Sequence, residues 1–236
     1  DTQIESVPLE ELVSKEHAAG LRGLIDMDRA ATDVPVASLV GVGTDTSQFC
    51  VVDTEGNAVT LIHSLYQGFG SGFLAEGTGI VFNGRQRGFR LQEGHPNTVA
   101  PGKRPMHTLN VYMVMKNGKP FLVGGTPGAD FQPQGNTQMI TGIVDYGFTP
   151  QEIVDAPRWM SIPGTDPATL DEEYGLQLEP RMPDDVARGL ESKGHKITWG
   201  QEGISHGIMQ IIQIDPETGV RMAGSDPRGD GHAVAL

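Results

Sequence analysis

Apolar residues recur at helical spacing near the start of the chain and at strand spacing soon after. Over residues 8–30, leucine, valine and isoleucine return every three or four positions with charged residues between them, which predicts one amphipathic helix. A polar linker over residues 31–45 follows. Residues 47–53 and 58–66 are then rich in β-branched and apolar side chains and flank a turn-forming segment. The sequence therefore predicts a β-hairpin after the linker.

The pattern changes twice more downstream. A glycine-rich connection runs to about residue 107, and a second hairpin is predicted over residues 109–124 around Asn117-Gly118, a strong hairpin turn signal. Further helices are predicted over residues 134–146, 150–156 and 183–193, and further strands over residues 195–200, 206–215 and 220–224. Hairpins, then helices, then more strands indicate an α+β fold with antiparallel sheets and not a βαβ ladder.

Composition narrows the classes of partner and cofactor. The 236 residues suffice for one substantial core or at most two small ones. The formal net charge of −13 argues against nucleic acid or an anionic membrane as a partner, and no apolar run approaches the roughly 20 residues of a membrane helix. Cys50 is the only cysteine of the sequence, which excludes an intrachain disulfide and a thiolate metal site. The compartment stays open, with the cytoplasm slightly favoured.

One motif points to a serine hydrolase. Residues 203–207, Gly-Ile-Ser-His-Gly, fit the G-x-S-x-G nucleophile elbow, which requires a strand before it and a helix after it. The isoleucine-rich run after the motif predicts a strand instead. Ser205 with Asp226 and His232 nevertheless stays as an alternative catalytic set. Neither nucleotide-binding fingerprint is present, and the seven histidines lack metal-ligand spacing.

Seven short blocks carry a more specific signal because they occur together and in order. They are TSQFCVVD (46–53), GNAV (56–59), FGSG (69–72), APGKRP (100–105), GTPG (125–128), DAPR (155–158) and SDPR (225–228). In this order and spacing the chain resembles the γ-glutamyltranspeptidase family of N-terminal-nucleophile hydrolases from about residue 46 to its end. The resemblance implies a four-layer αββα sandwich. Residues 1–45 resemble the end of the family's large subunit, and residues 46–236 its small, catalytic subunit.

The resemblance also implies a nucleophile. Members of the family cut themselves just before a threonine, and the matching residue is Thr46, so the expected cut lies between Asp45 and Thr46. The new chain end then carries a hydroxyl and an α-amine that serves as its base. Ser64 matches a threonine that supports the nucleophile. Gly128 and Ala129 match the paired glycines whose N–H groups form the oxyanion hole.

The positions that recognise glutamate in the family are altered. Arg87 is aligned with the carboxylate that binds the substrate's α-ammonium, and a charge reversal there should repel this group. His107 and Thr108 replace a serine pair, and Tyr66 replaces an asparagine, all of which bind the α-carboxylate in the family. Arg85 and Arg87 together would suit an anionic acyl group. This pattern resembles the non-transpeptidase branch, with oxamate amidohydrolase-like and acylase-like members.

The sequence thus predicts a self-processing amide hydrolase that forms an acyl-enzyme on Thr46 and is not selective for γ-glutamyl groups. Whether acyl transfer competes with hydrolysis stays open. The expected partners are a large subunit from the same precursor, in a heterodimer or a dimer of heterodimers, and a small-molecule amide. No cofactor and no metal are expected. The alternative of a different class is a non-catalytic binding or scaffold protein, in which Thr46 only leads into a strand and both arginines lie on a solvated loop.

Overall fold

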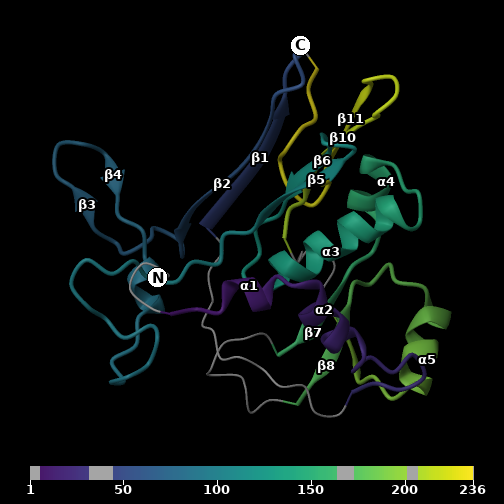
Figure 1. Cartoon of the computed structure of the whole chain (residues 1–236), viewed down its shortest axis with the longest axis horizontal. Coiled ribbons are helices and arrows are strands. Elements are labelled where there is room, and N and C mark those ends of the chain that lie inside the picture. The colour runs from purple at the N-terminus through teal and green to yellow at the C-terminus, as the bar shows by residue number, and fades with distance from the viewer. Residues whose placement is uncertain (1–5, 32–44, 164–172, 201–206, 236) are drawn as a thin grey trace.

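The computed structural model describes residues 6–31, 45–163, 173–200 and 207–235 (Figure 1). Its helices are α1 (Leu9–Leu12), α2 (Lys15–Arg22), α3 (Phe131–Val144), α4 (Pro150–Asp155) and α5 (Asp184–Ser192), with a 3₁₀ turn, η1, at Arg85–Gly88. Its strands are β1 (Asp45–Val52), β2 (Ala58–Tyr66), β3 (Leu74–Ala75), β4 (Ile80–Val81), β5 (Val111–Lys116), β6 (Lys119–Gly125), β7 (Trp159–Ile162), β8 (Gly175–Leu178), β9 (Ile197–Trp199), β10 (Gln210–Ile214) and β11 (Arg221–Ser225). The fold is α+β, as predicted. Among the described residues, no helix combines the length and the apolarity needed to cross a membrane.

The strands form two large antiparallel units and two smaller ones. Strands β1 and β2 make a long hairpin, and strands β11, β10, β6 and β5, in that order, make a four-stranded antiparallel sheet. Strands β3 and β4 form a short separate hairpin. In the third sheet, β7-β8-β9, strands β8 and β9 are parallel. The prediction of antiparallel sheets throughout is therefore wrong for this pair, because α5 carries the chain across between the two strands.

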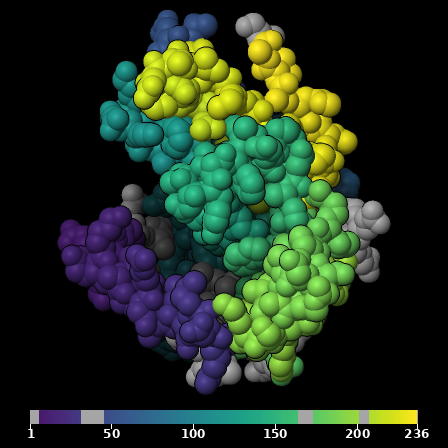
Figure 2. All heavy atoms as spheres, turned by 90° about the vertical axis from the view of Figure 1, so that its right-hand side faces the viewer, coloured from purple at the N-terminus to yellow at the C-terminus, as the bar shows by residue number. Residues whose placement is uncertain are grey.

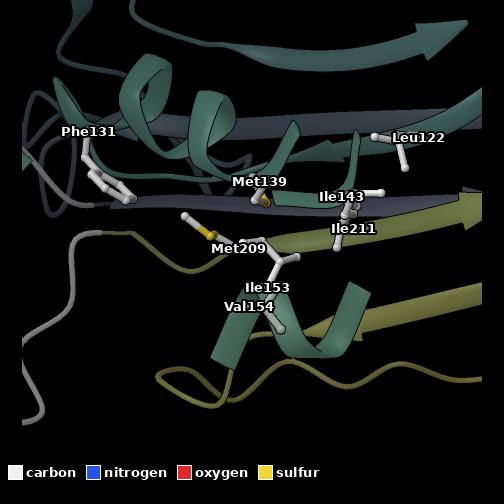
Figure 3. Packing of buried hydrophobic residues seen from close by; sticks show 8 residues of the cluster. All are labelled: Leu122, Phe131, Met139, Ile143, Ile153, Val154, Met209 and Ile211. Carbon is white, nitrogen blue, oxygen red and sulfur yellow. The ribbon is translucent and has the colours of Figure 1, made fainter. Parts of the chain in front are cut away.

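The elements stack in three layers. The β1–β2 hairpin packs on one face of the four-stranded sheet, and α3 and α4 cover the other face (Figure 1). The hydrophobic core fills the space between this sheet and the two helices (Figure 3). Its buried members are Leu122, Phe131, Met139, Ile143, Ile153, Val154, Met209 and Ile211. The described residues thus supply three layers of the predicted four-layer sandwich, in the order β, β, α.

Helix α3 can pack closely on its neighbours because glycines lie on its buried face. Phe131, Gly135, Met139 and Gly142 recur at three- or four-residue spacing and are all buried. A Cβ atom added to Gly142 would lie 2.3 Å from Cδ1 of Ile153 in α4. Close contact between α3 and α4 therefore holds the C-terminal end of α3, opposite to the end where the candidate oxyanion turn lies.

The predicted helix over residues 8–30 is wrong as a single element. Two short helices replace it, because the Ser14 side chain accepts a hydrogen bond from the N–H of His17 at 3.0 Å and begins a new helix. No residue of α1 or α2 is buried. After α2 the chain lies against the end of α5, where the N–H of Ala30 donates to the Lys193 carbonyl at 2.8 Å; Figure 2 shows this purple segment beside the green helix.

The outward face of the β1–β2 hairpin is apolar and exposed. Alternate side chains point away from the four-stranded sheet on each strand: Phe49 and Val51 are 48 % and 52 % exposed, and Val59 and Leu61 are 51 % and 42 % exposed. Such an apolar surface in the middle of a hairpin is typical of a face that another layer covers. No described residue of the chain supplies that layer, and the fourth layer stays a prediction.

Candidate functional site

Thr46 and Ser64 lie opposite each other where the β1–β2 hairpin opens. The two residues are a cross-strand pair, and the Thr46 hydroxyl donates to Oγ of Ser64 at 2.8 Å. The backbone N–H of Tyr66 donates to the same oxygen at 3.0 Å. Ser64 is therefore held by its own strand and in turn fixes the direction of the Thr46 hydroxyl. The structure thus brings the predicted nucleophile and its predicted support into direct contact.

The backbone is irregular at the predicted cleavage bond. Asp45 pairs with Tyr66 and Thr46 pairs with Ser64, so Leu65 is an extra residue that interrupts the ladder between them. Tyr66 has a φ of 82°, an uncommon conformation for a bulky side chain. Bulges and strained residues are over-represented beside active sites. In this continuous strand the nitrogen of Thr46 is a peptide nitrogen, so the geometry is that of the uncut chain.

The predicted oxyanion residues form a turn between β6 and α3. Gly128 and Ala129 have φ values of 129° and 48°, both in the region that favours glycine. Within the described part of the chain, neither N–H donates a hydrogen bond to the protein. The carbonyl groups of both residues instead accept from the first turn of α3, at 2.8 and 3.2 Å. Two unpaired N–H groups at a helix start suit a developing negative charge.

Strand β6 leads from the hairpin to this turn. The carbonyl of Gly124 accepts from the Thr60 hydroxyl at 3.2 Å, and a Cβ atom on the next residue, Gly125, would lie 3.2 Å from Cγ of Gln48. Gln48 lies two residues beyond Thr46 on the same face of β1. The chain after Gly125 therefore continues toward the Thr46 end of the hairpin. No hydrogen bond between described residues joins Thr46 to the turn itself.

A buried arginine lies beside the hairpin end. The Arg85 guanidinium stacks on the Tyr66 ring at 4.9 Å from its centroid and donates to the Thr108 hydroxyl at 3.0 Å. Arg85 is 8 % exposed, and burial lowers its pKa from the ordinary value. The N–H of Gly84 donates to the Leu65 carbonyl at 2.8 Å, which ties this segment to β2. Two predicted substrate-binding residues, Tyr66 and Thr108, are thus joined through Arg85.

The other two predicted substrate-binding residues make no side-chain hydrogen bond with this cluster. Arg87 and His107 are exposed. Neither side chain forms a hydrogen bond or an ion pair with another described residue. The sequence analysis named Arg85 only together with Arg87, as a pair that would suit an anionic acyl group. It did not predict that Arg85 is buried and contacts Tyr66 and Thr108. The roles of Arg87 and His107 stay predictions.

A buried ion network lies behind the oxyanion turn, and three of its four residues come from two of the sequence blocks, DAPR and SDPR. Arg158 pairs with Asp226, and Arg228 bridges Asp226 at 3.2 Å and also contacts Glu179. Burial lowers the pKa of Arg158, and the charge of Asp226 opposes that shift. The sequence identified these blocks as signatures of a family, but the network they form depends on contacts far apart in the chain.

The network reaches the oxyanion turn through Gly207. The Arg158 guanidinium donates to the Gly207 carbonyl at 3.2 Å. A Cβ atom on Gly207 would lie 2.3 Å from Oγ1 of Thr126 and 2.5 Å from the carbonyl oxygen of Pro127, and one on Gly128 would lie 3.3 Å from Cα of Gly207. The segment at Gly207 therefore packs tightly against the turn, and the buried arginine anchors that segment.

The serine-hydrolase alternative gains no support from these contacts. Ser205 lies outside the described residues. Asp226, its proposed acid, is occupied by Arg158 and by the N–H of Met209, which donates to it at 2.7 Å. The element after the motif is strand β10 and not the helix that a nucleophile elbow requires. Among the described residues, no group of three or more His, Cys, Asp or Glu side chains is placed to hold a metal ion.

Comparison with known proteins gives one consistent family. A family model described as Gamma-glutamyltranspeptidase matches residues 1–236. The chain is 40 % identical over 238 residues to the glutathione hydrolase-like YwrD proenzyme of Bacillus subtilis, covering 100 % of this chain and 43 % of that protein. It is 38 % identical to the solved cephalosporin acylase from Bacillus halodurans, with a TM-score of 0.82 over 98 % of this chain and 40 % of that one. It is 29 % identical to the solved γ-glutamyltranspeptidase from Helicobacter pylori, with a TM-score of 0.65 over 77 % of this chain and 99 % of that one.

Proposed function

The chain belongs to the γ-glutamyltranspeptidase family, and from this premise we propose that it is the catalytic part of an amide hydrolase that cuts itself before Thr46. The observation that carries the proposal is the 2.8 Å hydrogen bond between the Thr46 and Ser64 hydroxyls, directly beside an irregularity in the strand ladder. The chain spans less than half the length of the relative and the acylase described above. In this proposal, further residues outside this sequence complete the enzyme.

The proposed division lies between residues 1–45 and 46–236. Residues 46–236 are 191 of the 236 residues, or 81 % of the chain. The alignment with the Helicobacter pylori chain uses 77 % of this chain and covers 99 % of that one. This match supports a catalytic subunit of about the size of residues 46–236. The exposed apolar face of β1–β2 supports a large subunit that packs there and completes the sandwich as a heterodimer.

Self-cleavage would begin with the Thr46 hydroxyl. Its oxygen adds to the carbonyl carbon of Asp45, the C–N bond breaks, and the hydroxyl proton passes to the nitrogen, which becomes the free α-amine of Thr46. Water then hydrolyses the resulting ester and releases the Asp45 carboxylate. Ser64 supports this step because its hydrogen bond fixes the attacking oxygen.

Substrate hydrolysis would use the same oxygen with the new amine as its base. The α-amine of Thr46 takes the hydroxyl proton while the oxygen attacks the substrate carbonyl. The N–H groups of Gly128 and Ala129 stabilise the oxyanion, worth about 3–4 kcal/mol for one donor in comparable sites. The amine product leaves with the proton, and water resolves the acyl-enzyme. No cofactor enters these steps.

The acyl group in this proposal is not restricted to γ-glutamyl. The resemblance aligns Arg87 with the carboxylate that binds an α-ammonium group in the family, and a positive charge at that position supports a substrate without this group. This chain is also similar to a protein named as a cephalosporin acylase, and this similarity supports an acyl group other than γ-glutamyl. We therefore expect amides without an α-ammonium to be better substrates than their γ-glutamyl counterparts.

Intact mass and N-terminal sequencing test the proposal. The full-length wild-type protein should yield a fragment that begins at Thr46, Thr46→Ser should also be cut, and Thr46→Ala should stay whole. Ser47→Ala is the matched control, because Ser47 carries the neighbouring hydroxyl on the opposite face of β1, and it should be cut normally. A folded wild-type protein that stays whole would sink the proposal and favour the binding or scaffold alternative.

A further inference from the structure

Gln132 is a buried glutamine that uses only one end of its side-chain amide. The residue is 2 % exposed, and its Oε1 accepts from the backbone N–H of Asn110 at 3.0 Å. Because a backbone N–H can only donate, the atom that faces it must be the oxygen, which fixes the orientation of the amide. Nε2 is then the free end, and it donates to no described residue. An unused donor on a buried side chain calls for an explanation.

The other two glutamines of α3 show the contrast. Gln134 accepts from the N–H of Ser161 at 2.8 Å and donates to the carbonyl four residues earlier at 3.2 Å. Gln138 accepts from the N–H of Trp159 at 3.3 Å and donates to its carbonyl at 2.9 Å. Both amides are therefore used at both ends, although both residues are less buried than Gln132.

The unused donor of Gln132 still has access to solvent. Nε2 is not among the side-chain atoms of the described residues that are both sealed from solvent and without a hydrogen bond. The small exposed part of Gln132 therefore includes this atom. A polar group that is enclosed by protein but can be reached from one side is typical of a donor that faces a ligand.

The amide lies beside the candidate oxyanion turn. The N–H of Gln132 donates to the Ala129 carbonyl at 3.2 Å, so the side chain starts in the first turn of α3. Side chains of an α-helix lean toward its N-terminus, which here is the oxyanion turn. Asn110, which holds Oε1, directly precedes Val111, and Val111 pairs with Gly125 where the chain enters the turn. The amide is thus held between two segments that both reach the turn.

The group that holds the amide is itself fixed to α3. Asn136 lies one helical turn after Gln132 on the same face, and its Nδ2 donates to the carbonyl and to Oδ1 of Asn110, at 3.3 and 3.2 Å. Asn110 is therefore tied to the helix through both of its neighbours on α3. A donor that is held in place in this way loses little entropy when it binds a developing charge.

We propose that Nε2 of Gln132 is a third donor to the oxyanion, beside the N–H groups of Gly128 and Ala129. This inference rests on the proposed function of Thr46. When the Thr46 oxygen adds to the substrate carbonyl, the carbonyl oxygen becomes negatively charged. Nε2 then donates a hydrogen bond to that oxygen and keeps its proton, so it stabilises the charge without taking part in proton transfer. Because the amide is neutral, this contact is independent of the charge of the acyl group.

Two substitutions separate the donor from the rest of the side chain. Gln132→Glu keeps an oxygen for the Asn110 N–H and replaces the Nε2 donor by an acceptor, whereas Gln132→Met removes both polar ends. The full-length enzymes are assayed with acetyl, glutaryl and γ-glutamyl p-nitroanilide, and rates are divided by the concentration of processed subunit. On the best of the three substrates, kcat at neutral pH should fall roughly 100-fold in both variants. KM should change by less than about threefold, because the interaction forms only in the transition state.

The pH dependence of Gln132→Glu identifies the donor directly. A carboxylate cannot donate a hydrogen bond, whereas a protonated carboxyl group can. The kcat of Gln132→Glu divided by that of the wild type at the same pH should therefore rise as the pH falls. Ionisation of the Thr46 amine is common to both enzymes and cancels in this ratio. The same ratio for Gln132→Met should not change with pH, because methionine has no group that titrates.

Gln138→Met is the matched control, because it makes the same change on the same helix at an amide that binds strand β7 at both ends. It should lower the melting temperature and leave kcat unchanged. A structural role for Nε2 predicts the same result for Gln132. Oδ1 of Asn136 is sealed from solvent without a hydrogen bond, and a water between it and Nε2 would satisfy both atoms.

The outcomes separate this inference from the proposed function. If both Gln132 variants lower the melting temperature but keep kcat within about threefold of the wild type, the third donor is refuted and the structural role stands. A flat pH ratio for Gln132→Glu would refute it as well. If the wild type neither cuts itself nor hydrolyses any of the three anilides, the proposed function fails and the inference fails with it. An active wild type with unimpaired variants overturns the inference alone.

Discussion

Arg158 and Asp226 lie 68 residues apart and form an ion pair whose side chains are 2 % and 0 % exposed. Asp226 also accepts the N–H of Met209 at 2.7 Å, one residue before β10. Arg158 also donates to the carbonyls of Val154 and Gly207, at 3.0 and 3.2 Å. The pair therefore joins α4, β10 and the segment that packs under the oxyanion turn.

Neutralising Asp226 should destabilise the protein strongly. Asp226→Asn leaves the buried Arg158 without its closest counter-charge, and breaking a buried pair in this way costs about 3–5 kcal/mol in the free energy of unfolding. Urea denaturation of the wild type and the variant measures the difference. The matched control is Glu173→Gln, which breaks the exposed pair with Lys196 and should leave stability nearly unchanged. Equal effects of the two substitutions would contradict the role assigned to burial.

Removing the Ser64 hydroxyl should slow the chemistry of Thr46 without unfolding the protein. Ser64→Ala deletes one hydrogen bond to the nucleophile, so self-cleavage and turnover should fall by about tenfold, the equivalent of roughly 1.4 kcal/mol. Ser64→Thr keeps the hydroxyl and should restore most of the rate. The rate at which the Thr46 fragment appears, and kcat of the processed enzyme, are the two readouts. An unchanged rate in Ser64→Ala would show that Thr46 is positioned by other groups.

Ala129 should accept glycine but not valine. Its φ of 48° costs an alanine about 1–2 kcal/mol, and glycine removes that cost while adding backbone entropy to the unfolded chain. Ala129→Gly should therefore keep stability within about 1 kcal/mol of the wild type and keep activity. Ala129→Val should lose both, because a β-branched residue is a clear outlier at positive φ. Thermal melts with an amide-hydrolysis assay check this, and a fully active valine variant would refute it.

Local sequence signals predicted the hairpins well. The Asn117-Gly118 turn joins β5 and β6 as expected, and the predicted first hairpin agrees closely with β1 and β2. Helix α3 begins at Phe131, three residues before the predicted start, because a proline is tolerated in the first turn of a helix. The long N-terminal helix failed because Ser14 caps a new helix inside an otherwise periodic pattern.

Non-local contacts explain what the sequence did not predict. Strands β7 and β8 are four residues each, too short for a periodic pattern, and they form through pairing with each other and with β9. The same applies to the candidate site. Thr46 and Ser64 were predicted from the resemblance to the family, but Arg85 gains its importance only by stacking on Tyr66, which the sequence separates from it by a glycine-rich segment.

Cys50 should react slowly with alkylating reagents. Its alkylation should not abolish amide hydrolysis, which in the proposed function depends on Thr46. Burial raises the pKa of its thiol above the ordinary value, although hydrogen bonds with Gln48 and Thr60 oppose the shift. A raised pKa means less of the reactive thiolate at any given pH, so the pH at which iodoacetamide labelling begins should lie above that of free cysteine. Mass spectrometry of labelling between pH 7 and pH 10, with Cys50→Ser as a blank, measures this. Two results together would contradict this prediction: full labelling of Cys50 with loss of hydrolysis after brief treatment of the wild type at pH 7.5, and an inactive Cys50→Ser variant without treatment. The nucleophile would then be the Cys50 thiol and not the Thr46 hydroxyl.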